Sequence, residues 1–240
     1  MEDGTFKKPC MRGCITDLYM ILLAISFLVG CESEGNNRFP TVDRPTAGIF
    51  LEPEVRAVLP PGVELRPVHE KGLALTKRSE GFRERLYNDA AQYCTIAFGH
   101  LVKLAPCDGT ESPEFLKGVS EKRGTELLVN DMGKAQTAVM TSVDVDLTDG
   151  QYAALCDFVY NVGSGNFRRS TLRKVLKAGQ FDQVPYQLLR WVKAGGRELP
   201  GLKVRREQEI ALFFDGLPMA RALPPGELEL IDVRLGEEAP

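Results

Sequence analysis

Glu80, Asp89 and Thr95 are the residues whose types and spacing best suit chemistry. Asp89 follows Glu80 by nine residues and Thr95 follows Asp89 by six. Glu80 ends an expected helix, whereas Asp89 lies in a turn between expected strands, so the three side chains can converge across a cleft. Two such carboxyls suit hydrolysis of a glycosidic bond, because one donates a proton to the leaving oxygen while the other, ionised, activates water. For this role burial should raise the pKa of Glu80.

The elements that must position these side chains are mostly helical. Residues 73–79 should form a helix, and residues 83–100 a small hairpin or meander. Thr148 and Gln151 form a capping box that opens a further helix, which Gly163 ends. Other helices are expected over residues 170–178, 182–194 and 202–214. These elements predict an α+β fold class that is dominated by helix.

Composition excludes several classes of function. The 240 residues carry 30 basic and 33 acidic groups, a net charge of -3, so we expect no nucleic-acid partner. The chain has two histidines, His69 and His100, and no CxxC pair of cysteines, so we expect no metal site and no cofactor. Residues 71–216 alone carry a net charge of +3, which suits an anionic polymer.

The N-terminus has the pattern of an export signal over residues 1–31. Lys7, Lys8 and Arg12 precede an uncharged run over residues 18–30, which is shorter than the ~20 residues that a membrane-spanning helix needs. The run ends at Cys31 and resembles the lipobox of bacterial lipoproteins. We therefore expect an exported protein whose lipidated Cys31 anchors it to a membrane. A signal anchor, another export signal with secretion, and a buried helix are the alternatives.

Proline interrupts the chain on both sides of the central stretch. Residues 32–70 contain six prolines and read as an extended, semi-rigid linker, and residues 217–240 form a similar Pro- and Glu-rich tail. Residues 71–216 would then be the catalytic domain.

The cysteines divide by location if the protein is exported. In an oxidising compartment Cys94 and Cys107 are candidates for a disulfide, which would contribute roughly 3 kcal/mol by closing a short loop. Cys156 lies in an apolar helix and is expected to be a small buried side chain.

Several segments resemble one known family. Residues 79–82 (SEGF), 87–89 (YND) and 93–100 (YCTIAFGH) are similar to the catalytic segment of phage-type lysozymes, the endolysins of glycoside hydrolase family 24. Three more segments resemble the family in its order along the chain: residues 147–155 (LTDGQYAAL), 158–167 (FVYNVGSGNF) and 191–207, which contains WVKAGG and LPGL. The resemblance covers about residues 71–216 and implies a two-lobe lysozyme-like fold, with a β-hairpin lobe, a helical lobe and a cleft between them.

The resemblance also implies roles for particular residues. Glu80 matches the general acid, Asp89 the second carboxylate, and Thr95 the hydroxyl that places the attacking water. The implied reaction is inverting hydrolysis of the β-1,4 bond between N-acetylmuramic acid and N-acetylglucosamine in peptidoglycan. Peptidoglycan glycan strands are therefore the expected partner, and we expect a monomer. Further substrate contacts are implied for three residues: Leu101, Tyr160 and Asn161.

Other functions remain open on the same fold. A lytic transglycosylase uses one acid and forms an anhydro sugar, whereas Asp89 with Thr95 favours hydrolysis. A non-catalytic peptidoglycan-binding protein is a second alternative, against which the intact acidic pair argues. A cysteine amidase using Cys94 and His100 is the weakest, because nothing places a third, orienting residue.

Five more residues are given structural interpretations. His100 is expected to pair with an acid, and Trp191 is expected in the core. Arg205 and Arg206 are expected on a solvated helix face with salt bridges to neighbouring glutamates. Ala97 stands where the family usually has glycine.

Overall fold

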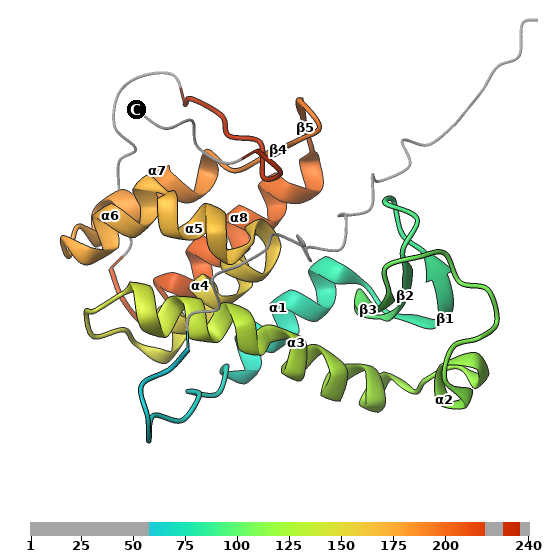
Figure 1. The fold of residues 1–240 in the computed structure, drawn as a ribbon. Coiled ribbons are helices and arrows are strands. Elements are labelled where there is room, and N and C mark those ends of the chain that lie inside the picture. The colour runs from blue at the N-terminus through green and yellow to red at the C-terminus, as the bar shows by residue number, and fades with distance from the viewer. Residues whose placement is uncertain (1–57, 219–227, 236–240) are drawn as a thin grey trace, which may run out of the picture. The chain divides into compact units, whose positions relative to one another are not determined.

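The computed structural model describes residues 58–218 and 228–235 of the chain. The expected export signal, Cys31, residues 32–57 of the linker and parts of the tail lie outside the described residues. The elements, in chain order, are α1 (Glu70–Glu80), β1 (Arg83–Asn88), β2 (Cys94–Ala97), β3 (His100–Lys103), α2 (Pro113–Lys117), α3 (Glu121–Ser142), α4 (Asp149–Val162), α5 (Ser164–Arg169), α6 (Thr171–Lys177), the 3-10 turn η1 (Phe181–Gln183), α7 (Val184–Leu189), β4 (Lys193–Ala194), β5 (Arg197–Glu198) and α8 (Pro200–Phe213) (Figure 1). The predicted helix-dominated α+β class is confirmed.

The three strands β1, β2 and β3 form an antiparallel sheet in that order. Its inner side packs on a small apolar cluster that includes Ile96 and Ala97 from β2 and Leu127 from α3. Ala97 has φ of 58°, in the left-handed region that favours glycine. The conformation gives a physical reason for glycine at this position in similar sequences.

Helix α3 links the sheet to the helical part of the domain. It contacts β2 and β3 near one end and α4 and α5 near the other, as Figure 1 shows. Ser120 caps its first turn by accepting a hydrogen bond from the backbone N–H of Arg123. This helix of 22 residues was not among the predicted elements.

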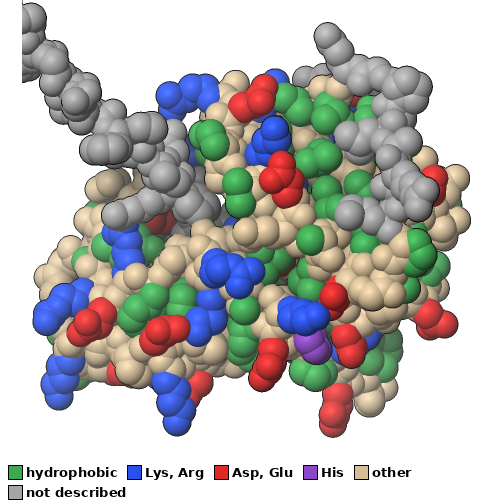
Figure 2. Space-filling view, turned by 180° about the vertical axis from the view of Figure 1, so that it is seen from behind, with side chains coloured by type: hydrophobic (Ala, Val, Ile, Leu, Met, Phe, Trp, Pro, Cys, Tyr) green, Lys and Arg blue, Asp and Glu red, His purple; other side chains and the backbone are tan. Residues whose placement is uncertain are grey.

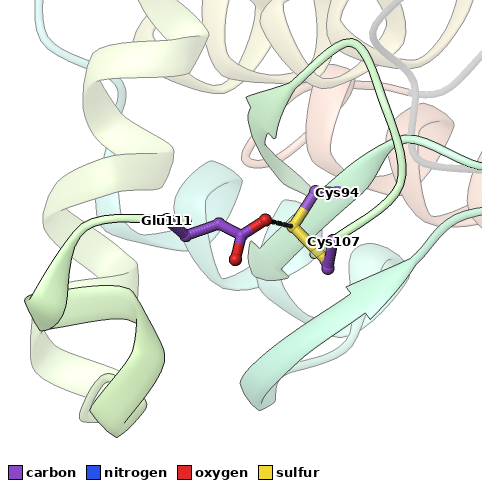
Figure 3. A group of neighbouring side chains, drawn as sticks. All are labelled: Cys94, Cys107 and Glu111. Atoms are coloured by element: carbon purple, nitrogen blue, oxygen red, sulfur yellow. Dashed lines mark hydrogen bonds between the residues drawn. A yellow bond between two sulfur atoms is a disulfide. The ribbon is translucent and has the colours of Figure 1, made fainter. Parts of the chain in front are cut away.

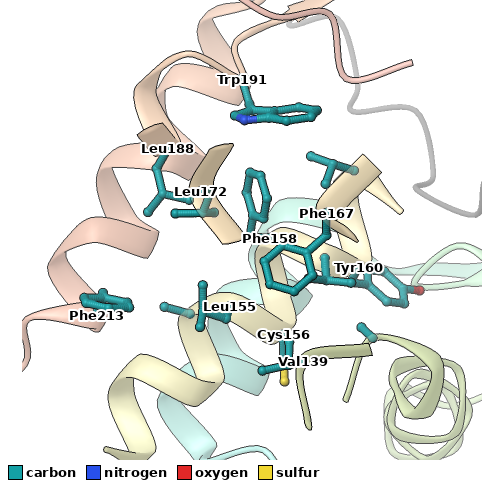
Figure 4. Close-up of a cluster of buried hydrophobic side chains, with 14 of the residues drawn as sticks. Val139, Leu155, Cys156, Phe158, Tyr160, Phe167, Leu172, Leu188, Trp191 and Phe213 are labelled. Carbon is teal, nitrogen blue, oxygen red and sulfur yellow. The ribbon is translucent and has the colours of Figure 1, made fainter. Parts of the chain in front are cut away.

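Helix α4 is the centre of the helical core, and every residue from Gln151 to Val162 is buried. A helix that is apolar on nearly all sides must be covered on all sides, and α1, α3, α5 and α8 contact it. Figure 4 shows side chains of α4 among residues of the surrounding helices, with Trp191 against Phe158. Trp191 has no exposed surface, which confirms its predicted place in the core.

Two glycines bring α1 and α8 into close contact with α4. A Cβ atom at Gly72 of α1 would lie 2.5 Å from the Cβ of Ala153, and one at Gly150 would lie 2.6 Å from the backbone oxygen of Leu212 in α8. Such distances leave no room for a side chain, so the backbones themselves set the spacing. The helices that end in Glu80 and contain Arg205 are therefore held directly against the core helix.

The helix predicted over residues 182–194 is wrong in its extent. The chain forms η1 and then the short α7, with Pro185 in the first turn of α7, where its missing N–H is not needed. Beyond α7 the chain turns Trp191 into the core and continues as the β4–β5 hairpin. The second half of the expected helix does not form, because Trp191 packs in the core and the following residues pair as β4 and β5.

The tail predicted from residue 217 contributes to the packed domain over residues 228–235. Ile231 and Val233 are 5 % and 4 % exposed and join the main core. Asp232 accepts a hydrogen bond of 2.6 Å from the backbone N–H of Gly196, at the turn of the β4–β5 hairpin. This part of the tail is therefore not an extended appendage.

The last residues of the predicted linker also pack on the domain. The carbonyl of Arg66 accepts hydrogen bonds from Gln136 of α3 at 2.7 Å and from the Tyr152 hydroxyl of α4 at 2.8 Å. The Arg66 guanidinium pairs with Asp149 at 2.6 Å. The predicted boundary at residue 70 is therefore too late, because the packed unit includes Arg66.

Candidate active site

Glu80 is the last residue of α1 and is followed by Gly81, whose φ of 69° directs the chain into β1. The Glu80 side chain is only 1 % exposed, and its Oε1 accepts a hydrogen bond of 2.8 Å from Nη1 of Arg205 in α8. Burial raises the pKa of Glu80 above its ordinary value, although the positive charge of Arg205 opposes this shift. The carboxyl therefore holds its proton to a higher pH than an exposed glutamate does, as a general acid requires.

Asp89 begins the turn that joins β1 to β2. Its Oδ1 accepts hydrogen bonds of 2.8 Å from the backbone N–H groups of Ala91 and Tyr93. No hydrogen bond within residues 58–218 and 228–235 uses Oδ2. The turn thus holds the carboxylate by one oxygen and leaves the other available to a water molecule or substrate.

The strand register places two of the predicted hairpin residues, Thr95 and Leu101, on one face of the sheet. Tyr87 of β1 lies opposite Thr95 of β2, and Thr95 lies opposite Leu101 of β3. Asp89 follows Tyr87 by two residues, and its backbone N–H donates to the carbonyl of Tyr93 at 3.0 Å. Since directly opposed residues share a face, Thr95 and Leu101 lie on one face of the sheet, and Asp89 lies in the turn that follows β1. Thr95 is 1 % exposed.

Tyr160 of α4 is a buried residue on which the charge of Glu80 acts. The side chain is 6 % exposed, and Figure 4 shows its hydroxyl directed away from Phe158 and Phe167. Burial raises the pKa of Tyr160 well above its usual value, and the charges of Glu80, Asp131 and Tyr87 add to the shift. The Tyr160 hydroxyl therefore lies within electrostatic range of Glu80.

Asn161 does not belong to that group. It is 3 % exposed, and its Oδ1 accepts a hydrogen bond of 2.5 Å from Nη2 of Arg206. Its side-chain oxygen is therefore bound inside the protein, and the implied contact of Asn161 with substrate stays a prediction.

The interpretation of Arg205 and Arg206 as a solvated helix face is wrong. Arg205 is 2 % exposed and Arg206 has no exposed surface. Nε and Nη2 of Arg205 each lie 2.9 Å from a different oxygen of Asp157, while Nη1 binds Glu80. The guanidinium therefore connects α8 to α4 and to the end of α1. The sequence signal for this network was an acid within the apolar run of α4, which we did not single out.

Cys94 and Cys107 form a disulfide between β2 and the loop before α2. Figure 3 shows Glu111 beside it, with Oε1 3.5 Å from the sulfur of Cys94. These three residues are the one group of potential metal ligands found among the described residues. Disulfide sulfurs are not thiolates and cannot act as anionic ligands, and Glu111 already accepts the backbone N–H groups of Asp108 and Gly109. The disulfide also removes the thiol that a cysteine amidase would need.

His100 and Cys156 have the structural roles that their sequence context predicts. The Nδ1 atom of His100 lies 2.8 Å from Oδ2 of Asp131 in α3, which confirms an acidic partner. Cys156 is a free, fully buried cysteine. Burial raises the pKa of its thiol to about 12, so it stays neutral.

Comparisons with known proteins agree with this arrangement. The family model for phage lysozyme matches residues 77–209. The chain is 36 % identical over 152 residues to an endolysin of Bacillus phage B103, covering 62 % of this chain and 54 % of that protein. It thus spans about half of the length of that relative. A SAR-endolysin of bacteriophage PS119 is 35 % identical over 131 residues, which cover 54 % of this chain and 73 % of the relative.

A solved structure of a P22 lysozyme mutant superposes with a TM-score of 0.54 at 30 % identity, over 62 % of this chain and 98 % of that one. Its coverage shows that nearly the whole P22 fold is present here. The matched residues 77–209 include Glu80, the hairpin face and the Arg205 network. The chain therefore belongs to the phage lysozyme family.

Proposed function

We propose that this protein is a monomeric lysozyme that hydrolyses the β-1,4 bond between N-acetylmuramic acid and N-acetylglucosamine in peptidoglycan. The observation that carries the proposal is the buried Glu80, whose pKa is raised, at the end of α1 and directly before the hairpin that carries Asp89 and Thr95. Membership of the phage lysozyme family supports the same substrate. The chemistry needs carboxyls, a hydroxyl and water, and these residues supply the first two.

In the proposed mechanism Glu80 transfers its proton to the glycosidic oxygen as the bond from that oxygen to the anomeric carbon breaks. Asp89, through its available Oδ2, accepts a proton from a water molecule that attacks the anomeric carbon from the opposite side. Thr95 helps to place this water. The new bond joins the water oxygen to the sugar, so the configuration inverts, and proton exchange with solvent restores Glu80 and Asp89.

The three remaining candidate residues differ in their proposed roles. We propose that Leu101, on the same hairpin face as Thr95, contacts a sugar ring, and that the Tyr160 hydroxyl lies where it can contact substrate beside Glu80. For Asn161 we propose a supporting role, because its hydrogen bond fixes Arg206 in the buried network.

Analysis of the products tests the proposal against a lytic transglycosylase. Purified peptidoglycan digested by the protein should yield fragments with reducing N-acetylmuramic acid ends. A transglycosylase would yield anhydro ends that are lighter by one water molecule, and mass spectrometry separates the two. Anhydro products would contradict the roles of Asp89 and Thr95, and no cleavage at all would favour the non-catalytic binding protein.

We further propose that the protein is exported and anchored to a membrane through lipid on Cys31, with a signal anchor or simple secretion as the alternatives. The support is the basic start and uncharged run of residues 1–31, together with relatives named SAR-endolysin. Among the described residues no helix has both the length and the apolar character to span a membrane. The intact mass of the mature protein should show cleavage before Cys31 and a lipid adduct; an unmodified N-terminus would contradict lipidation.

A further inference from the structure

Three buried carboxyls share two guanidinium groups behind the candidate active site. The side chains of Glu80, Asp157 and Glu209 are at most 1 % exposed, and those of Arg205 and Arg206 at most 2 %. Arg205 does not bond these carboxyls equally. Asp157 accepts hydrogen bonds from two of its nitrogens, Nε and Nη2, at 2.9 Å each, whereas Glu80 accepts one, from Nη1, at 2.8 Å.

We propose that Asp157 is a positioning residue for the reaction: by occupying the two-nitrogen edge of Arg205, it limits that guanidinium to one bond with Glu80 and so preserves Glu80 as a proton donor. This proposal rests on the proposed function of Glu80 as the general acid. Paired guanidinium–carboxylate bonds are stronger than single ones and favour the ionised carboxylate. An Arg205 without Asp157 would be free to turn that edge toward Glu80 and stabilise its carboxylate form, so that Glu80 releases its proton to solvent at a lower pH.

The charge of Asp157 acts in the same direction as its geometry. Burial is the main cause of the raised pKa of Glu80; the charge of Arg205 lowers this pKa and the charge of Asp157 raises it. Although burial opposes ionisation of Asp157 itself, its contacts with Arg205 hold the pKa of that carboxyl below its usual value. Asp157 therefore remains ionised and offsets the charge of Arg205 at Glu80.

Glu209 differs from Asp157 although it lies in the same cluster. Neither of its oxygens has a hydrogen-bond partner among the described residues, and its nearest cation is Nη2 of Arg206 at 3.1 Å. Burial raises the pKa of Glu209 well above its usual value. A protonated Glu209 can donate a hydrogen bond to Asp157, which an ionised one cannot. Glu209 therefore lacks both the paired bonds to Arg205 and the lowered pKa that distinguish Asp157.

The groups that face Glu80 and Asp157 come from several elements. They are Thr76 of α1, Tyr160 of α4, Arg205, Arg206 and Glu209 of α8, with Asp131 of α3 and Tyr87 of β1 acting on Tyr160. The Asp157→Asn variant leaves all of these residues in place and changes only residue 157.

The test compares Asp157→Asn with the matched variant Glu209→Gln, since both convert a buried carboxyl to an amide. The alkaline limb of the pH profile of kcat/KM on soluble peptidoglycan fragments reports the general acid of the free enzyme. For Asp157→Asn we expect this limb to move to lower pH by about one unit. At a pH above the limb, kcat/KM should then be roughly tenfold lower than in the wild-type protein. For Glu209→Gln the limb should stay at the wild-type position. An unmoved limb in Asp157→Asn, or an equal shift in both variants, would overturn the proposal.

A measurement on the wild-type protein covers the case in which Asp157→Asn does not fold. Carboxyl-carbon NMR of protein labelled at aspartate and glutamate should show Asp157 ionised and Glu209 protonated at neutral pH. The reverse assignment would refute the proposal. Failure of the proposed function itself would appear elsewhere, as full activity in a Glu80→Gln variant.

Discussion

A Glu80→Gln variant is expected to retain the fold and to lose roughly 10²- to 10⁴-fold of its peptidoglycan hydrolysis, the range that general acid catalysis contributes. Glutamine has nearly the same shape, and its amide oxygen can still accept the hydrogen bond from Nη1 of Arg205. It has no acidic proton for the leaving oxygen. The measurement is the rate at which new reducing ends form in purified peptidoglycan, with the fold checked by circular dichroism.

Glu70→Gln is the matched control, because Glu70 is an exposed residue in the first turn of the same helix. This variant should hydrolyse peptidoglycan at the wild-type rate. A Glu80→Gln variant as fast as Glu70→Gln would show that Glu80 is not the general acid. A loss confined to binding, with kcat unchanged, would equally contradict the mechanism, since proton transfer affects the transition state.

An Arg205→Met variant is expected to lose about 3–5 kcal/mol of unfolding free energy, because removing one partner of a buried ion pair leaves the other charge uncompensated. Asp157 has no exposed side-chain surface and would lose both hydrogen bonds from the guanidinium fork. Methionine fills much of the same space, so the loss comes from charge more than from a cavity. Urea unfolding at neutral pH measures it.

Arg78→Met provides the comparison, since Arg78 is exposed on α1. Its stability should stay within about 0.5 kcal/mol of wild type. The double variant Arg205→Met with Asp157→Leu should lose less than the sum of the single changes, because it removes the orphaned charge. Equal stability of Arg205→Met and Arg78→Met would show that the buried network contributes nothing.

Several elements could be predicted from the sequence because local chemistry determines them. The capping box of Thr148 and Gln151 and the stop at Gly163 marked α4 correctly, since caps involve residues within a few positions of each other. Ser170 marked the start of α6 in the same way. The hairpin was recognised from turn residues between short apolar runs. Helix α3 was missed because its apolar side is interrupted by Gly124, Gly133 and many polar residues.

The predicted position of Glu80 at a helix end was right, and so was the placement of Asp89 in the following turn. A helix end and a short turn are both encoded by a few neighbouring residues. That the register also brings Thr95 and Leu101 onto one face follows from the pairing of three successive strands.

Other features were decided by tertiary structure. Arg205 is 125 residues from Glu80 in the chain, and its sequence context is that of an ordinary charged helix. Its burial depends on the close approach of α1 and α8 to α4, which Gly72 and Gly150 permit. Residues 228–235 have a composition that suggests a tail, yet they pack because the backbones of Ile231 and Val233 bond to Arg190 and Lys193 and their side chains join the main core.

The sequence by itself thus determined the family and the positions of two carboxyls, Glu80 at a helix end and Asp89 in the following turn. Only the tertiary structure decided which of the carboxyls behind the site carry charge. The reason is physical: the pKa of a carboxyl depends on loss of water and on the charges beside it. For Glu80, the charges that act on its pKa belong to residues of α4 and α8, which are remote from it in the chain.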